Sequence, residues 1–214
     1  MKYFILLVML ILPLTFASGQ KIGELAPEKP PEVFPSHSWG MDIMFGEGGF
    51  GLGTFLRQRF NSSLTGFVDL SISESKDDRE IEFVDYFGQS FTRGKVNRVF
   101  IVPLNFGVQY RLFESQITDN LRPYINAGAG PTLVLTTPYA KEFFKAFGDT
   151  KSKIAAGAYV GFGANFGLSK SNLLGINVRY YFIHMFDDGV ENLEGRFRKD
   201  LGHFYVTINL GIMY

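Results

Sequence analysis

Apolar and polar residues alternate with a period of two through most of the chain after Trp39, as in β-strands with two chemically different faces. The clearest segment is the last, where apolar side chains occupy every second position from Phe204 to Tyr214. The same alternation predicts further strands at residues 64–75, 98–113, 122–136, 153–168 and 173–186. In the first of these, Phe67 interrupts the polar face.

Residues 39–60 also alternate but are too long for one ordinary strand. Glu47-Gly48-Gly49 supplies turn residues, so we predict two strands, 39–46 and 50–60. With this split the chain has eight strands, and without it seven. The predicted fold class is all-β, an eight-stranded antiparallel up-and-down transmembrane β-barrel.

Alternation alone does not say which face points inward, because a soluble barrel buries its apolar face and a membrane barrel exposes it to lipid. In this chain the opposite face is rich in glycine and carries charges at mid-strand. Glycine suits a crowded lumen, and an arginine facing lipid at the bilayer midplane costs about 2–4 kcal/mol. We therefore place in the lumen a polar network of Asp42, Arg57, Arg59, Asp69, Arg111 and Arg179.

The connections after residue 60 alternate in length, with 61–63, 114–121 and 169–172 short and 76–97, 137–152 and 187–202 long. Short periplasmic turns and long outer loops are typical of bacterial outer-membrane barrels. Aromatic residues also gather where strands end, as expected at a water–lipid boundary. They include Trp39, Phe60, Tyr110, Phe113, Phe182, Phe186 and Tyr214.

The N-terminal segment has the pattern of a secretory signal peptide. Lys2 precedes an apolar run from Tyr3 to Phe16, and small residues follow. We predict a signal peptide at 1–19, a Pro-rich periplasmic leader at 20–38, and the barrel at 39–214.

The signal peptide, the glycine-rich lumen face and the final strand HFYVTINLGIMY resemble the small outer-membrane β-barrel proteins of Gram-negative bacteria, of the OmpA-barrel, OmpX and OmpW type. The resemblance covers roughly residues 39–214 and implies location in the cell outer membrane, in contact with its lipid. It also implies an assembly signal read by the barrel-assembly machinery, at Leu210, Ile212 and Tyr214. Members act as anchors, adhesins, assembly factors and small-solute channels, so the resemblance fixes location better than role.

Composition excludes several other functions. Lys plus Arg and Asp plus Glu are both 21, so no basic field favours nucleic acid, and the chain has no cysteine for disulfides or thiolate sites. Asp77-Asp78 and Asp187-Asp188 lack the ordered oxygen spacing of a calcium loop, so we expect solvated acids. No metal and no cofactor is expected.

Two interpretations of the lumen remain open. The charged residues can pair and form a plug, filled out by aromatic side chains, or they can line a narrow passive pore for small solutes. The aromatic candidates are Phe55, Phe67, Tyr124, Tyr159, Tyr181 and Tyr205. We favour the plug, and with it a structural or interaction role in a monomeric protein.

A rim-located lipid-modifying enzyme is the third hypothesis, since His184 and His203 fall near the outer rim. The two histidines have opposite facing parity, no serine lies within two residues of His184, and no glutamate lies at an obvious third-partner position. We expect no enzyme and no catalytic residue.

The long loops 76–97 and 137–152 are the candidate contact surfaces for an extracellular protein partner. Residues 80–96 suggest a hairpin that continues the barrel strands outward, with an edge that could pair with a partner strand. A solvated hairpin that pairs only with itself is the alternative, and we favour it. Residues 138–147 place Phe143, Phe144 and Phe147 at one-turn spacing after Pro138. We expect a short helix over the barrel mouth, capping the lumen or touching lipid headgroups.

Overall fold

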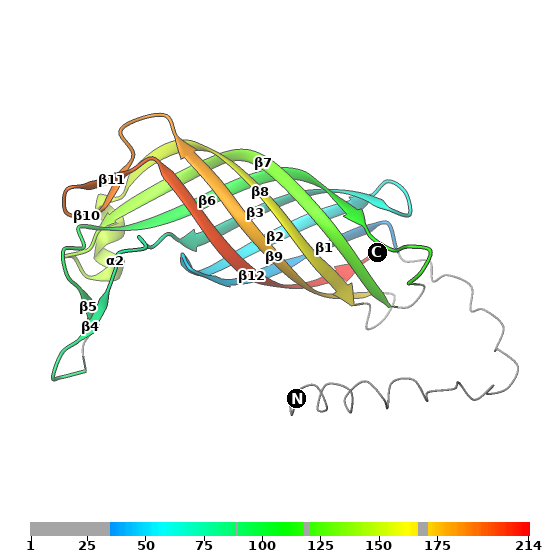
Figure 1. Ribbon diagram of the computed structural model, residues 1–214, viewed down its shortest axis with the longest axis horizontal. Coiled ribbons are helices and arrows are strands. Elements are labelled where there is room, and N and C mark those ends of the chain that lie inside the picture. The colour runs from blue at the N-terminus through cyan, green and yellow to red at the C-terminus, as the bar shows by residue number, and fades with distance from the viewer. Residues whose placement is uncertain (1–34, 89, 118–119, 167–170) are drawn as a thin grey trace, which may run out of the picture. The chain divides into compact units, whose positions relative to one another are not determined.

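The computed structural model describes residues 35–88, 90–117, 120–166 and 171–214. Eight antiparallel strands close into one barrel in the order β1-β12-β9-β8-β7-β6-β3-β2 (Figure 1), which confirms the predicted fold class. These strands are β1 (His37–Gly46), β2 (Gly49–Arg59), β3 (Leu64–Glu74), β6 (Asn97–Arg111), β7 (Leu121–Pro138), β8 (Lys151–Phe166), β9 (Asn172–Met185) and β12 (Asp200–Met213). The expected signal peptide and most of the leader lie outside the described residues.

Residues 39–60 form two strands, as predicted. Gly46 pairs with Gly49 across the turn, and Gly49 has a φ of +118°, which favours glycine. The connection between β1 and β2 is therefore a tight turn. The alternation of short and long connections begins only after residue 60.

Two hairpins and a short helix stand at the long-loop end of the barrel, which we call the outer end (Figure 1). The hairpins pair β4 (Glu82–Val84) with β5 (Ser90–Thr92), and β10 (Val190–Leu193) with β11 (Arg196–Arg198). The helix α2 (Phe143–Ala146) continues into a 3-10 turn, η2 (Phe147–Asp149). In the described part of the chain, no helix has the length and apolar character to cross a membrane.

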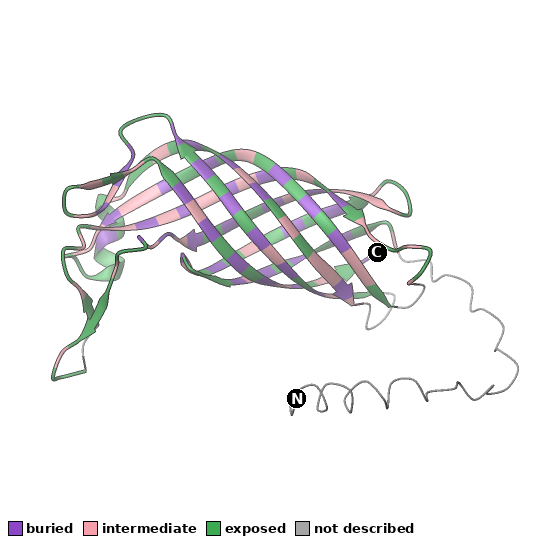
Figure 2. Ribbon diagram, viewed as in Figure 1, coloured by how far each residue is buried: buried purple, intermediate pink, exposed green. Residues whose placement is uncertain are grey.

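The apolar face points outward and the polar, glycine-rich face points inward. In β1, Trp39 is 46% exposed, whereas Asp42 is 1% exposed. Figure 2 shows the same alternation of buried and exposed positions along the other strands. The exposed band of large apolar side chains is the surface that a lipid bilayer covers in barrels of this kind.

Two phenylalanines break the polar face because each lies over a pair of glycines. Phe67 projects into the lumen over Gly107 and Gly128, which face each other on β6 and β7. A Cβ on Gly107 would collide with the Phe67 ring and with the Ala127 carbonyl oxygen. Phe55 covers the pair of Gly40 and Gly211 in the same way. These glycines are required by close approach of a ring and, at Gly40, Gly107 and Gly211, also of a carbonyl oxygen on the neighbouring strand, not by a turn.

Strands β1 and β12 close the wall. Their ends are joined by two backbone hydrogen bonds: His37 N donates to Tyr214 O at 3.1 Å, and Tyr214 N donates to His37 O at 2.9 Å. The two rings also stack, with centroids 5.7 Å apart. Leu210, Ile212 and Tyr214 all point outward on this strand.

Candidate functional site

An ion cluster at the centre of the lumen joins three of the six charged residues that the sequence placed there. Arg179 Nη2 lies 2.8 Å from Asp42 Oδ2, and Arg179 Nη1 lies 3.7 Å from Asp69 Oδ2. All three side chains are at most 3% exposed. One guanidinium thus faces two carboxylates in a space shielded from solvent.

Asparagines and tyrosines complete the cluster. Asn209 donates to Asp42, and Asn105 donates to Asp69 at 2.9 Å. Tyr159 also donates to Asp69, at 2.9 Å. The wider network links residues of seven strands through Asp42, Asp69, Asn105, Tyr124, Asn126, Tyr159, Asn177, Arg179 and Asn209. We call this set the central plug. The alternation of apolar and polar positions predicted its charges and tyrosines in the lumen but gave its asparagines no distinct role.

The other three predicted lumen residues lie elsewhere along the barrel axis. Arg57, Arg59 and Arg111 line a cavity of about 60 Å³ at the short-turn end. Arg122, which was not among the predicted lumen residues, lines it too. None of them reaches the carboxylates that pair with Arg179. We call this cavity the arginine chamber.

A second closure lies at the outer end. Asp77 is buried and pairs with Arg196 at 2.6 Å and with Arg198 at 3.6 Å, both from the β10–β11 hairpin. The expectation of a solvated acid was therefore wrong for Asp77, because the hairpin folds back over the mouth and supplies two cations. Asp78 is the exposed member of that pair.

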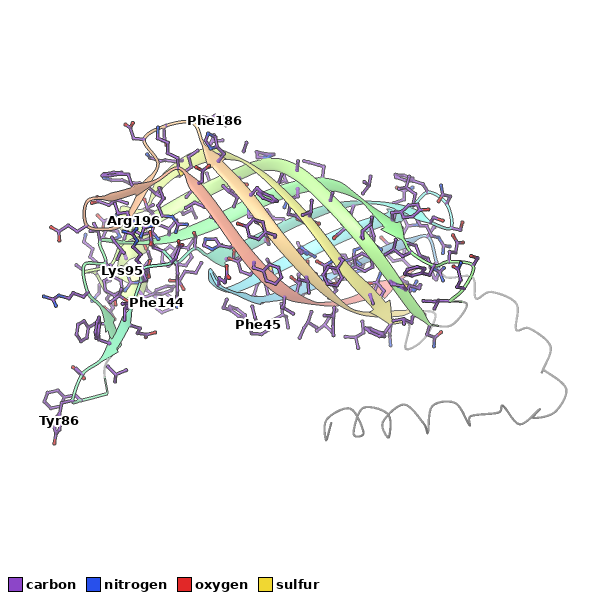
Figure 3. All side chains as sticks on the ribbon, in the orientation of Figure 1. Phe45, Tyr86, Lys95, Phe144, Phe186 and Arg196 are labelled. Carbon is purple, nitrogen blue, oxygen red and sulfur yellow. The ribbon has the colours of Figure 1, made fainter. Side chains whose placement is uncertain are left out.

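Lys95 ties the same region together. Its Nζ lies 2.6 Å from Glu80 and 3.5 Å from Glu74, and its backbone bridges to Leu193 of β10. Figure 3 shows Lys95 and Arg196 at this end of the barrel. The ion pairs of Asp77 and Lys95 join the segment after β3, the base of the β4–β5 hairpin and the β10–β11 hairpin into one unit, which we call the outer lid.

The two rim histidines lie on opposite sides of the wall, as their parity predicted. His203 is buried in the lumen and hydrogen-bonds Ser75, whereas His184 is exposed and lies 2.7 Å from Asp200. The Ser75–His203 pair is 128 residues apart in sequence, so no local pattern could show it. The serine–histidine pair and the histidine–aspartate pair do not join into one triad.

The β4–β5 hairpin carries the most exposed aromatic residues. At its tip Tyr86 is 98% exposed and Phe87 is 85% exposed. Behind the tip, Phe83 and Phe91 stack across the two strands with centroids 5.8 Å apart. Figure 3 shows Tyr86 at the far end of this hairpin. The predicted hairpin is thus present, but it forms a separate two-stranded sheet, so the expectation that it continues the barrel strands was wrong.

The helix α2 packs against the outside of the wall, not over the mouth. Phe143 and Phe147 contact the outward-facing ring of Phe100 on β6, with centroids 6.3 and 6.1 Å apart. Phe144 remains exposed (Figure 3). A capping role for this helix was therefore the wrong alternative, because its phenylalanines find an apolar partner on the lipid-facing side.

Two loop acids have perturbed pKa values. A hydrogen bond from Ser63 Oγ is the main cause that lowers the pKa of Glu114, in the connection between β6 and β7. A hydrogen bond from Lys153 lowers the pKa of Asp187 in the same way. Neither group belongs to a candidate metal site, since no three acidic or histidine side chains of the described residues are grouped to hold a metal ion.

No family model matches the chain, and no curated protein matches it. Among solved structures it is similar to Neisserial surface protein A, with a TM-score of 0.51 and 10% identity over 83% of this chain and 94% of that one. The chain has the fold of a small outer-membrane barrel. It is also similar to the N-terminal β-barrel domain of Pseudomonas aeruginosa OprF, with a TM-score of 0.47 and 13% identity over 84% of this chain and 97% of that one. A further similarity is to Ail, the attachment invasion locus protein of Yersinia pestis, with a TM-score of 0.41 and 12% identity over 84% and 99% of the two chains.

Proposed function

We propose that this barrel is a non-conducting anchor in the outer membrane of a Gram-negative cell, and that its β4–β5 hairpin binds an extracellular protein. The observation that carries the proposal is the highly exposed aromatic pair at the hairpin tip, Tyr86 and Phe87. Large apolar side chains gathered on a water-exposed surface are typical of contact sites. Tyrosine in particular gives a large contact area at a low cost in side-chain entropy.

The base of the hairpin supports this role because it is held by the outer lid. Lys95, just after β5, forms ion pairs with Glu80, just before β4, and with Glu74 at the end of β3. The two ends of the hairpin are therefore tied to each other and to the barrel. A rigid base reduces the entropy lost when the tip binds a partner.

The lumen supports an anchor over a channel. The central plug fills the lumen with paired charges and buried tyrosines, and the outer lid adds ion pairs at the outer end. An eight-stranded barrel is just wide enough for side chains to fill it. A narrow passive pore is the alternative function. Planar-bilayer recording separates the two: we expect no discrete conductance from the wild type. Discrete conductance that changes in Arg57→Gln or Arg179→Gln would favour the pore.

The binding test uses cells that display the protein and measures their adhesion to immobilised extracellular-matrix proteins and to cells of the same kind. We expect the double variant Tyr86→Ser/Phe87→Ser to reduce adhesion several-fold. The matched control is Phe144→Ser, which removes an equally exposed aromatic from another outer loop. Equal adhesion by the hairpin variant and the wild type would contradict the proposal.

We also propose that the role is non-catalytic, in contrast to a rim enzyme acting on lipid. The separation of Ser75–His203 and His184–Asp200 by the barrel wall supports this proposal. The test is the lipid composition of membranes that contain the wild type, His184→Ala or His203→Ala. A lipid modification that disappears in a folded histidine variant would contradict it.

A further inference from the structure

We propose that the arginine chamber, at the short-turn end of the lumen, is a binding site for a small phosphate-type oxyanion, held by Arg57 and Arg111. The chamber lies at the end opposite the β4–β5 hairpin, so this site is independent of the proposed contact role. Four arginines from β2, β6 and β7 line it, and none of its described lining residues is an aspartate or glutamate. It therefore concentrates positive charge in a concave space.

The first observation that points to a bound anion is that the Arg57 guanidinium is buried with few hydrogen-bond acceptors. Arg57 is only 7% exposed, and its guanidinium carbon lies 4.0 Å from the centroid of the Phe55 ring, on which it stacks. Within the described chain its one hydrogen bond is a long one, from Nη1 to the Asn165 side chain at 3.4 Å. A guanidinium has five N–H donors, and a buried cation is costly unless it is paired. Arg179 satisfies this requirement with carboxylates, and Arg57 does not.

Arg111 and Gln109 give the second argument. Arg111 Nη2 donates to the Ile117 carbonyl at 3.0 Å, but its Nε is buried with no acceptor among the described residues. Gln109 Oε1 is likewise buried with no donor within the same set. Orphaned polar atoms around one cavity indicate that an occupant supplies their partners.

The two atoms without partners, Arg111 Nε and Gln109 Oε1, together favour a phosphate as the ligand. Arginine binds phosphate oxygens through its planar fork of donors. The Gln109 oxygen needs a donor, and inorganic phosphate retains a P–OH group at neutral pH, whereas sulfate does not. We therefore infer that the chamber prefers phosphate to sulfate.

The size and position of the chamber fit this ligand. A volume of about 60 Å³ holds roughly four waters or one tetrahedral anion. The central plug closes the inner end of the chamber, so the ligand enters from the short-turn side. Glu114, a carboxylate at that end, does not line the chamber and accepts a hydrogen bond from Ser63, although Arg111 and Arg59 lie near enough for their charges to act on it.

The experiment titrates the full purified protein with inorganic phosphate by isothermal calorimetry, in maltoside micelles that contain no phosphate, at low ionic strength and pH 7. We expect saturable binding that weakens about ten-fold or more in Arg57→Gln and in Arg111→Gln, because each removes charge-assisted hydrogen bonds. Sulfate should bind several-fold more weakly than phosphate, and Gln109→Met should abolish this preference. The matched control is Arg93→Gln, an exposed arginine in the outer loop after β5.

Folding of each variant is checked by its far-ultraviolet β-strand signal, and Arg57→Lys provides a second variant that keeps the charge but loses the fork. The absence of saturable phosphate binding by the wild type would overturn the proposal. Unchanged binding in both Arg57→Gln and Arg111→Gln would also overturn it.

A dissolved phosphate and a phospholipid headgroup share this chemistry, and bilayer composition distinguishes them. The same titration is repeated in nanodiscs of phosphatidylcholine and of phosphatidylglycerol. Equal affinity in both supports dissolved phosphate as the ligand. Weaker apparent affinity only in phosphatidylglycerol supports a site occupied by the anionic headgroup.

Discussion

Arg179 and Asp42 form an ion pair across the lumen, with Nη2 and Oδ2 2.8 Å apart and neither side chain more than 2% exposed. The two residues are 137 positions apart in sequence and lie on β9 and β1, with β12 between these strands. The pair therefore links strands that share no backbone hydrogen bonds.

Replacing Arg179 by methionine leaves Asp42 and Asp69 buried without a cation. We expect the free energy of unfolding to fall by about 3–5 kcal/mol, the usual loss when one partner of a buried pair is removed. Denaturant titration of the barrel in lipid vesicles measures this change. The triple variant that adds Asp42→Asn and Asp69→Asn should recover much of the loss, and a triple variant as unstable as the single one would contradict this account.

Gly107→Val tests the close approach of Phe67. The new side chain would meet the Phe67 ring and the Ala127 carbonyl oxygen, so we expect a loss of about 3 kcal/mol or failure to fold, at the upper end of overpacking costs. Folding yield in vesicles is the measurement. Gly148→Val is the control because, apart from its chain neighbours and its own helix backbone, no atom lies within 4 Å of its Cβ position. A similar loss in both variants would contradict the packing argument.

Asp77→Asn tests the outer lid. Because Asp77 pairs with both Arg196 and Arg198, its loss should loosen the β10–β11 hairpin and speed proteolysis within residues 186–199 at least several-fold. Limited proteolysis of the reconstituted barrel checks this. Asp78→Asn should change little, since Asp78 is exposed and its ion pair with Arg198 is 3.5 Å long. Equal rates in the two variants would show that burial of Asp77 is unimportant to the lid.

Glu114 should give the short-turn end a small dependence of stability on pH. Its pKa in the folded protein is lowered from 4.5, first by the Ser63 hydrogen bond, so its carboxylate stabilises the fold above the unfolded pKa. That contribution is lost as the pH falls below 4.5 through the lower folded pKa. NMR titration of Glu114 should show its pKa rising toward 4.5 in Ser63→Ala, and an unchanged pKa would contradict the assigned cause.

The strands could be predicted because period-two alternation marks both the element and its face. Arg57 and Arg179 were correctly placed inside by this rule. Alternation says nothing of height along the axis, which depends on strand tilt and register. The sequence pattern therefore grouped Arg57 with Arg179, although Arg57 lies in the arginine chamber and Arg179 in the central plug.

Contacts made by loops were the least predictable part. The pairs Asp77–Arg196 and Ser75–His203 join residues more than a hundred positions apart, and loops carry no periodic signal that could bring such residues together. The helix α2 shows the same limit: its phenylalanine spacing predicted a short helix, but only the position of Phe100 decides that it packs outside the wall.

The backbone bonds between His37 and Tyr214 also bear on how the barrel is made. Strand β12 pairs with both β1 and β9, so a chain without it would present two open sheet edges, each with a row of unsatisfied amides and carbonyls. Hydrocarbon offers no water to solvate these groups, so a partial sheet could not rest stably in the bilayer. Insertion into the bilayer and closure of the barrel must consequently be coupled, and the pairing of the last strand completes both.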